Sequence, residues 1–117
     1  MRVLLGFVLL CALLLASPAN ATQPVEVRVN PAVSLAPATV VLTILVEPDE
    51  RNRLLTVVAD SGDFYRSSEV TLEGDRASRT RRITLRNLPP GEYTIRASVT
   101  RADNSSRIAE TQMVVTG

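Results

Sequence analysis

The stretch Leu88-Pro89-Pro90-Gly91-Glu92-Tyr93, continued as far as Val99, decides the fold of this 117-residue chain. From Tyr93 to Val99, apolar residues alternate strictly with polar ones, so the segment has a period of two. That period is typical of a β-strand with one buried face. A proline–glycine turn that leads into such a segment indicates a loop entering a half-buried antiparallel strand. We therefore predict an all-β protein.

Similar alternation recurs along residues 25–116, and turn residues separate the apolar segments. The clearest case runs from Thr39 to Glu47, where alternate aliphatic side chains share one face. We predict strands over residues 25–29, 39–47, 54–59, 68–72, 81–85, 93–101 and 108–115. This spacing is typical of a two-sheet antiparallel β-sandwich of about seven strands. The prolines that follow the first strand all fall outside the predicted strands, as a sheet requires.

Residues 1–21 have the composition of a signal peptide. Arg2 supplies a positive charge, an apolar run follows, and Ala19 and Ala21 match the small-residue pattern that signal peptidase cleaves. The apolar run is shorter than the ~20 residues that a helix needs to span a bilayer. We predict cleavage after Ala21, which leaves residues 22–117 as a single exported domain, periplasmic or secreted. An uncleaved membrane anchor is the alternative.

The composition of the chain excludes several kinds of chemistry. The sequence contains no His and no Lys, and its one cysteine, Cys11, lies in the predicted leader. The predicted domain therefore lacks imidazole and thiolate nucleophiles, their usual metal sites and Schiff-base lysines. A pair of carboxylates could still act, but only beside a cleft that a sandwich of this size rarely has. We predict a chain that is not an enzyme and that binds no cofactor.

The segment from Leu88 to Val99 resembles the corner before the penultimate strand of immunoglobulin-like and fibronectin type III-like domains in bacterial exported proteins. The resemblance implies that Tyr93 is a tyrosine-corner residue, with a buried ring and a hydroxyl bonded to the backbone a few residues upstream. Similar corners occur in other β-sandwiches, such as collagen-adhesin B-type repeats. The chain has no tryptophan and no cysteine pair, so it departs from an immunoglobulin domain in the strict sense.

Five arginines are concentrated in one part of a chain whose formal net charge is only +1. They are Arg76, Arg79, Arg81, Arg82 and Arg86. We expect Arg82 and Arg86 to point outward from their strand. The cluster could be a patch for an anionic surface, or a solvated face neutralised by Glu69, Glu73 and Asp75. The low net charge and the scarcity of aromatic residues argue against nucleic acid as a partner.

The adjacent aromatic residues Phe64 and Tyr65 are followed by Arg66, beside a predicted turn at residues 60–63. On a strand the two rings face opposite ways, so we expect one ring in the core and one partly exposed. The exposed ring and Arg66 could form a small partner-binding patch. Alternatively, both rings cap the end of the core.

Carboxylates gather in two predicted loops, at Glu47, Asp49 and Glu50 and again at Asp60 and Asp63. Several oxygen ligands in one place can bind calcium. The second loop lacks the ligand spacing of an EF-hand, and Asp beside Gly is typical of a turn. We interpret these carboxylates as turn residues, with calcium binding as the alternative.

Four apolar residues fall at positions that we expect to point outward, namely Val41, Leu45, Leu54 and Val58. Apolar residues at such positions on two strands indicate that a sheet face is covered. The cover could be the N-terminal segment, a second copy of the chain or another protein.

Together these observations predict that the protein has a non-catalytic function. We expect an exported, non-catalytic protein-interaction or structural module of the bacterial envelope, which acts through a sheet face or an edge strand. The alternative is a protein inhibitor of an exported hydrolase, acting through loop 60–66 or arm 75–82. The predicted partner is another protein or a second copy of the chain, with no nucleic acid and no stable membrane insertion after leader cleavage.

Overall fold

The computed structural model describes residues 23–117 and gives them an all-β fold. The predicted signal peptide, with Ala19 and Ala21, lies outside the described residues. The strands of this part of the chain are β1 (Val25–Asn30), β2 (Val33–Leu35), β3 (Ala38–Val46), β4 (Asn52–Asp60), β5 (Tyr65–Thr71), β6 (Thr80–Leu88), β7 (Gly91–Arg101) and β8 (Ser106–Thr116). A short 3₁₀ turn, η1 (Gly74–Arg76), lies between β5 and β6. No helix in this part of the chain is long and apolar enough to cross a membrane.

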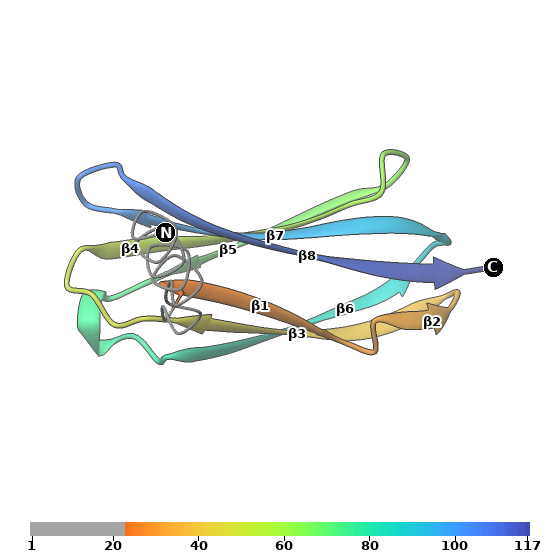
Figure 1. Cartoon of the computed structure of the whole chain (residues 1–117), viewed down its shortest axis with the longest axis horizontal. Coiled ribbons are helices and arrows are strands. Elements are labelled where there is room, and N and C mark those ends of the chain that lie inside the picture. The colour runs from red at the N-terminus through yellow and green to blue at the C-terminus, as the bar shows by residue number, and fades with distance from the viewer. Residues whose placement is uncertain (1–22) are drawn as a thin grey trace, which may run out of the picture.

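The strands form two sheets that pack face to face (Figure 1). The smaller sheet has the order β1-β3-β6, and the larger sheet has the order β2-β8-β7-β4-β5. Neighbouring strands are antiparallel, except that β2 runs parallel to β8. The predicted two-sheet β-sandwich is therefore confirmed for the described residues.

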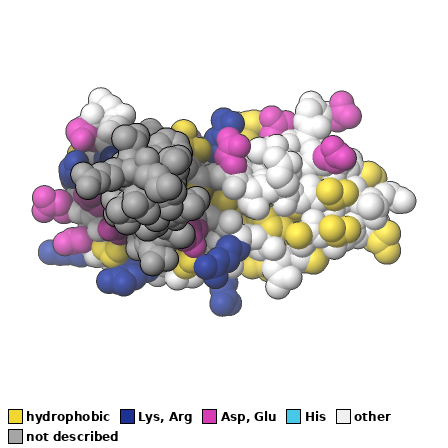
Figure 2. Space-filling model, viewed as in Figure 1, with side chains coloured by type: hydrophobic (Ala, Val, Ile, Leu, Met, Phe, Trp, Pro, Cys, Tyr) yellow, Lys and Arg dark blue, Asp and Glu magenta, His cyan; other side chains and the backbone are white. Residues whose placement is uncertain are grey.

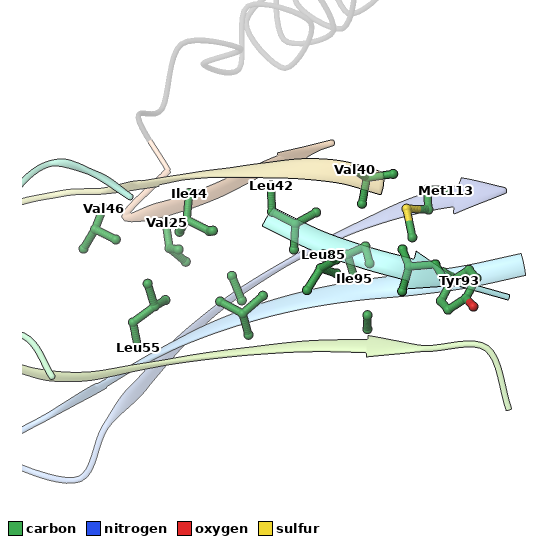
Figure 3. Packing of buried hydrophobic residues seen from close by; sticks show 14 of the residues in the cluster. Val25, Val40, Leu42, Ile44, Val46, Leu55, Leu85, Tyr93, Ile95 and Met113 are labelled. Atoms are coloured by element: carbon green, nitrogen blue, oxygen red, sulfur yellow. The ribbon is translucent and has the colours of Figure 1, made fainter. Parts of the chain in front are cut away.

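The core is formed by alternate side chains of β3, β4 and β7, as the sequence predicts. Val40, Leu42 and Ile44 of β3 are fully buried. Figure 3 shows side chains of β3 directed toward Leu55 on the opposite sheet. Burial of one such aliphatic side chain contributes about 1.5–3 kcal/mol. Because the described residues contain no cysteine, this aliphatic layer provides the stability that disulfides supply in many small domains.

Tyr93 closes one end of the core. Its ring is fully buried, and its hydroxyl donates a hydrogen bond to the Pro89 carbonyl oxygen at 2.7 Å. Phe64 packs edge-on against this ring, with the two centroids 6.2 Å apart. Gly91 allows the β4–β5 loop to approach, because a Cβ at this position would lie 3.0 Å from the Cβ of Ser61. The hydroxyl hydrogen bond is the one that the tyrosine-corner resemblance implied.

Three strands differ from the prediction. β6 continues to Leu88, three residues beyond its predicted end at residue 85. The sequence prediction omits β2, a strand of three residues that lies between Pro31 and Pro37 and is too short to show a period. It also starts β5 at Ser68, whereas the strand begins at Tyr65. The first residues of β5 are mostly polar and form part of an edge strand, so they give no apolar pattern.

Replacement of Tyr93 by Phe would remove the hydroxyl and leave the ring in place. We expect the free energy of unfolding to fall by about 1 kcal/mol, because the end of the core loses one hydrogen bond. Urea denaturation of the purified protein measures this change. Tyr65→Phe is the matched control, since Tyr65 is 64% exposed and its hydroxyl is expected to contribute nothing. Equal losses in the two variants would contradict the role of the corner.

Candidate functional site

The outer face of the three-stranded sheet brings together three residues that the sequence singled out, Val41, Leu45 and Arg82. The register places Arg28 and Arg82 on either side of Thr43, in the middle of this face. Both arginines are exposed, whereas Val41 and Leu45 are half-buried between their neighbours on β1 and β6. We call the surface formed by these five residues the arginine face.

Other arginines of the predicted cluster extend the arginine face. Arg86 is exposed near the end of β6, and Arg79, just before β6, lies beside Leu45. Arg76 is exposed in η1 and lies instead beside carboxylates of η1 and of the β3–β4 loop. Arg81 has the opposite phase and is half-buried, because it alternates toward the inner side of the sheet. The cluster therefore places most of its positive charge on one side of the sandwich.

The clustered arginines form no ion pair within the part of the chain that the structure describes. The arginines that do form ion pairs there are Arg28, Arg51, Arg96 and Arg101. Neutralisation by Glu69, Glu73 and Asp75, one of the two sequence interpretations, is therefore not observed as close contacts. Glu69 lies on the outer face of the opposite sheet, away from the cluster. The cluster leaves exposed positive charge beside the arginine face.

A hollow of about 240 Å³ opens beside Leu45. Its lining combines apolar surface with Glu26, Glu47 and Arg79. Glu26 is already paired with Arg28, at an Oε2–Nη2 distance of 3.3 Å. The hollow therefore adds apolar surface at one end of the arginine face.

The outer face of the five-stranded sheet has the opposite charge. Its outward positions on β4, β5, β7 and β8 carry the carboxylates Asp60, Glu69, Glu92 and Glu110 and the arginine Arg96. We call this surface the acidic face. In Figure 2, dark blue side chains project from the lower side, where β1 and β3 lie, and magenta ones from the upper right, whereas both kinds are present at the left end. The net charge of the chain is therefore low because its two outer faces carry charges of opposite sign.

The segment Phe64-Tyr65-Arg66 does not form one patch. Phe64 packs on the core, and the Cζ of Arg66 lies 5.1 Å from the centroid of its ring. Arg66 also donates a hydrogen bond from Nη1 to the Arg86 carbonyl oxygen at 2.8 Å, which links the edges of the two sheets. Tyr65 points the other way, onto the acidic face. The two rings do face opposite ways, but the predicted patch of Tyr65 with Arg66 is wrong, because their side chains leave opposite sides of β5.

The outward apolar residues also lie on two different faces. Val41 and Leu45 belong to the arginine face, whereas Leu54 and Val58 are half-buried on the outer face of the larger sheet. A single cover over one sheet face, as the sequence suggested, cannot account for both pairs. Each pair lies on a strand with a neighbour on either side, and those neighbours bury the aliphatic side chains in part.

Two of the loop carboxylates, Asp49 and Asp60, have partners within the described residues. Arg51 holds both oxygens of Asp49, with Nε–Oδ1 and Nη2–Oδ2 distances of 3.1 and 2.9 Å. Arg101 adds a second contact, 3.5 Å from Oδ2. The hydrogen bonds from Arg51 hold the pKa of Asp49 well below its usual range. In the other loop, Asp60 accepts a hydrogen bond from the Gly62 N–H at 2.8 Å, which is the role of a turn residue.

Comparisons with known proteins show that the fold of this chain is similar to that of a solved structure. No protein-family model matches the chain, and no curated protein matches it. Among solved structures, the chain is similar to a superoxide reductase (neelaredoxin) from Ignicoccus hospitalis. The TM-score is 0.64 at 14% sequence identity, and the match covers 80% of this chain and 81% of that chain.

This likeness corrects two predictions. We predict no enzyme because the predicted domain lacks His, Cys and Lys and because a small sandwich rarely has a cleft, yet a chain of similar fold and extent is a superoxide reductase. The prediction that the chain is not an enzyme is therefore wrong. The function built on it is wrong as well, both the non-catalytic interaction or structural module and the alternative of a hydrolase inhibitor.

The residues present do not fit a redox metal centre. Reduction of superoxide requires a redox-active group, and protein metal centres of that kind rely largely on imidazole and thiolate ligands. The described residues contain neither His nor Cys. They also contain no group of three or more His, Cys, Asp or Glu side chains that could hold a metal ion. We derive no step through such a centre.

The ion pair of Asp49 predicts a pH-dependent stability. Because the pKa of Asp49 is lower in the folded chain than in the unfolded chain, its ionised form stabilises the fold above the unfolded pKa, about 4. That stabilisation is lost as the pH falls below about 4, through the folded pKa. We expect Asp49→Asn to lower the melting temperature at neutral pH, and the difference from the unsubstituted protein to shrink in acid.

Thermal unfolding followed by circular dichroism at several pH values measures this difference. Asp63→Asn is the control, since it removes one carboxylate from a different exposed loop. A difference for Asp49→Asn that stays constant from neutral pH into acid would show that the carboxylate charge is not the stabilising element.

Proposed function

We propose that the chain is exported and that its arginine face binds the anionic surface of a membrane from one side. The leader-like composition of residues 1–21 supports export to the periplasm or beyond. The observation that carries the binding proposal is the set of exposed cluster arginines that form no ion pair within the described residues, beside outward aliphatic side chains.

The geometry of the arginine face suits phosphate groups that lie in one plane. Arg28 and Arg82 flank Thr43 on a three-stranded sheet, so their guanidinium groups lie on the same outer surface. Arg28 is paired there with Glu26, whereas Arg82 forms no ion pair within the described residues. A guanidinium donates paired hydrogen bonds to the oxygens of a phosphate. Near an anionic membrane each arginine contributes about 1 kcal/mol, and this contribution decays within a Debye length of about 8 Å. Arginines that share one face act together, whereas arginines spread over the whole surface do not.

Aliphatic side chains strengthen the same contact. Val41 and Leu45 are half-buried on the outer side of β3, between the polar residues of β1 and β6. Apolar side chains on a charged surface can enter the boundary between lipid headgroups and acyl chains. The hollow beside Leu45 adds apolar surface, although its lining also includes Glu26 and Glu47. The acidic face lies on the opposite side of the sandwich, so an anionic membrane would repel it. This repulsion would orient the three-stranded sheet toward the membrane.

We also propose that the sandwich is of the immunoglobulin-like or fibronectin type III-like kind. The order β1-β3-β6 corresponds to strands A, B and E of such a fold, and the order β8-β7-β4 corresponds to strands G, F and C. The hydrogen bond from Tyr93 to the Pro89 carbonyl oxygen supports the same assignment.

Co-sedimentation with lipid vesicles tests the binding. The protein without residues 1–21 is used, since an apolar leader would itself bind lipid. We expect binding to vesicles that contain phosphatidylglycerol, weaker binding to vesicles of phosphatidylcholine alone, and a loss of binding in high salt. Arg82→Glu is expected to lower the affinity at least about fivefold, because it replaces an attractive charge on the face with a repulsive one.

Arg107→Glu is the matched control. Arg107 is exposed on β8 in the larger sheet, so its replacement changes the net charge equally and leaves the arginine face intact. The proposal requires this variant to retain most of the binding. Equal losses in Arg82→Glu and Arg107→Glu, or equal affinity for the two kinds of vesicle, would contradict it.

A further inference from the structure

The acidic face contains a hollow of its own. Its volume is about 280 Å³, and its lining consists of Val58, Asp60, Tyr65, Thr94 and Arg96. Three of these residues lie in one row across the sheet, since Asp60 is opposite Tyr65 on β5 and Thr94 on β7. Val58 and Arg96 form part of the next row. The hollow is therefore built by three adjacent strands.

We propose that this hollow binds a guanidinium group carried by a ligand. Tyr65 is 64% exposed, so its ring is open to a flat cation. Asp60 supplies a carboxylate next to the ring. Its Oδ1 accepts the Gly62 N–H, and its Oδ2 has no hydrogen-bond partner among the described residues. A guanidinium can stack on an aromatic ring and donate paired hydrogen bonds to a carboxylate at the same time.

The charge around the hollow favours a cation. Arg96 also lines the hollow, but Glu110 compensates its charge, with Nε and Nη2 at 2.8 and 2.7 Å from one carboxylate oxygen. Glu69 and Glu92 add to the negative potential of the acidic face. The volume is below the ~300 Å³ at which pockets for drug-sized ligands begin, so it suits a group the size of one side chain.

Titration with N-acetyl-arginine amide, followed by NMR of the backbone amides, tests this proposal. We expect saturable shifts that centre on the hollow, between β5 and β7. N-acetyl-citrulline amide has nearly the same shape without the charge, and it should bind at least about fivefold more weakly. Tyr65→Ala and Asp60→Asn should each weaken binding of the arginine compound by at least about fivefold. Asn at position 60 keeps the acceptor for Gly62, so the turn is retained.

Asp63→Asn is the matched control. Asp63 lies in the same loop but does not line the hollow, so its replacement should leave binding unchanged. Equal binding of the citrulline compound, or equal effects of Asp60→Asn and Asp63→Asn, would overturn the proposal. Asp60→Asn should retain binding to anionic vesicles, so a failure here is distinguishable from a failure of the membrane-binding function.

Discussion

The strict alternation of β3 and β7 constrains the rest of this structure. Every second side chain of these strands is buried between the two sheets. A slip of one residue in the register would turn Arg96 toward the core and expose the aliphatic row. Burial of a charge without its partner costs several kcal/mol, so the buried row fixes the register of its neighbours. The fixed register then decides which side chains form the two outer faces.

The separation of charge follows from this register. Arg28 and Arg82 are far apart in the sequence, yet they flank the same residue of β3. The carboxylates of the acidic face likewise come from four different strands. A net charge close to zero is therefore compatible with a strongly dipolar domain. An anionic membrane would orient such a domain with the smaller sheet toward the lipid, which leaves the hollow beside Tyr65 open on the far side.

The sequence alone predicts those parts of the fold in which apolar and polar residues alternate regularly. The alternation in β3 and β7 predicts their buried rows, and the corner motif predicts the hydrogen bond of Tyr93. Alternation also predicts the outward direction of Arg82. It cannot place Arg28 and Arg82 on either side of Thr43, because that arrangement depends on the strand order β1-β3-β6, which no local pattern contains. The likeness to a superoxide reductase shows further that this class of fold does not by itself exclude an enzyme.

Opposite charge on the two outer faces can be measured directly. Two soluble nitroxides of similar size, one anionic and one cationic, relax amide protons in proportion to the local concentration that the surface potential gives them. We predict that the anionic nitroxide relaxes the amides of β1, β3 and β6 more strongly than the cationic one does, and that the order reverses for β4, β5 and β7. Both binding proposals depend on this separation of charge. It would be contradicted if the ratio of relaxation by the anionic nitroxide to relaxation by the cationic nitroxide were the same for both sheets.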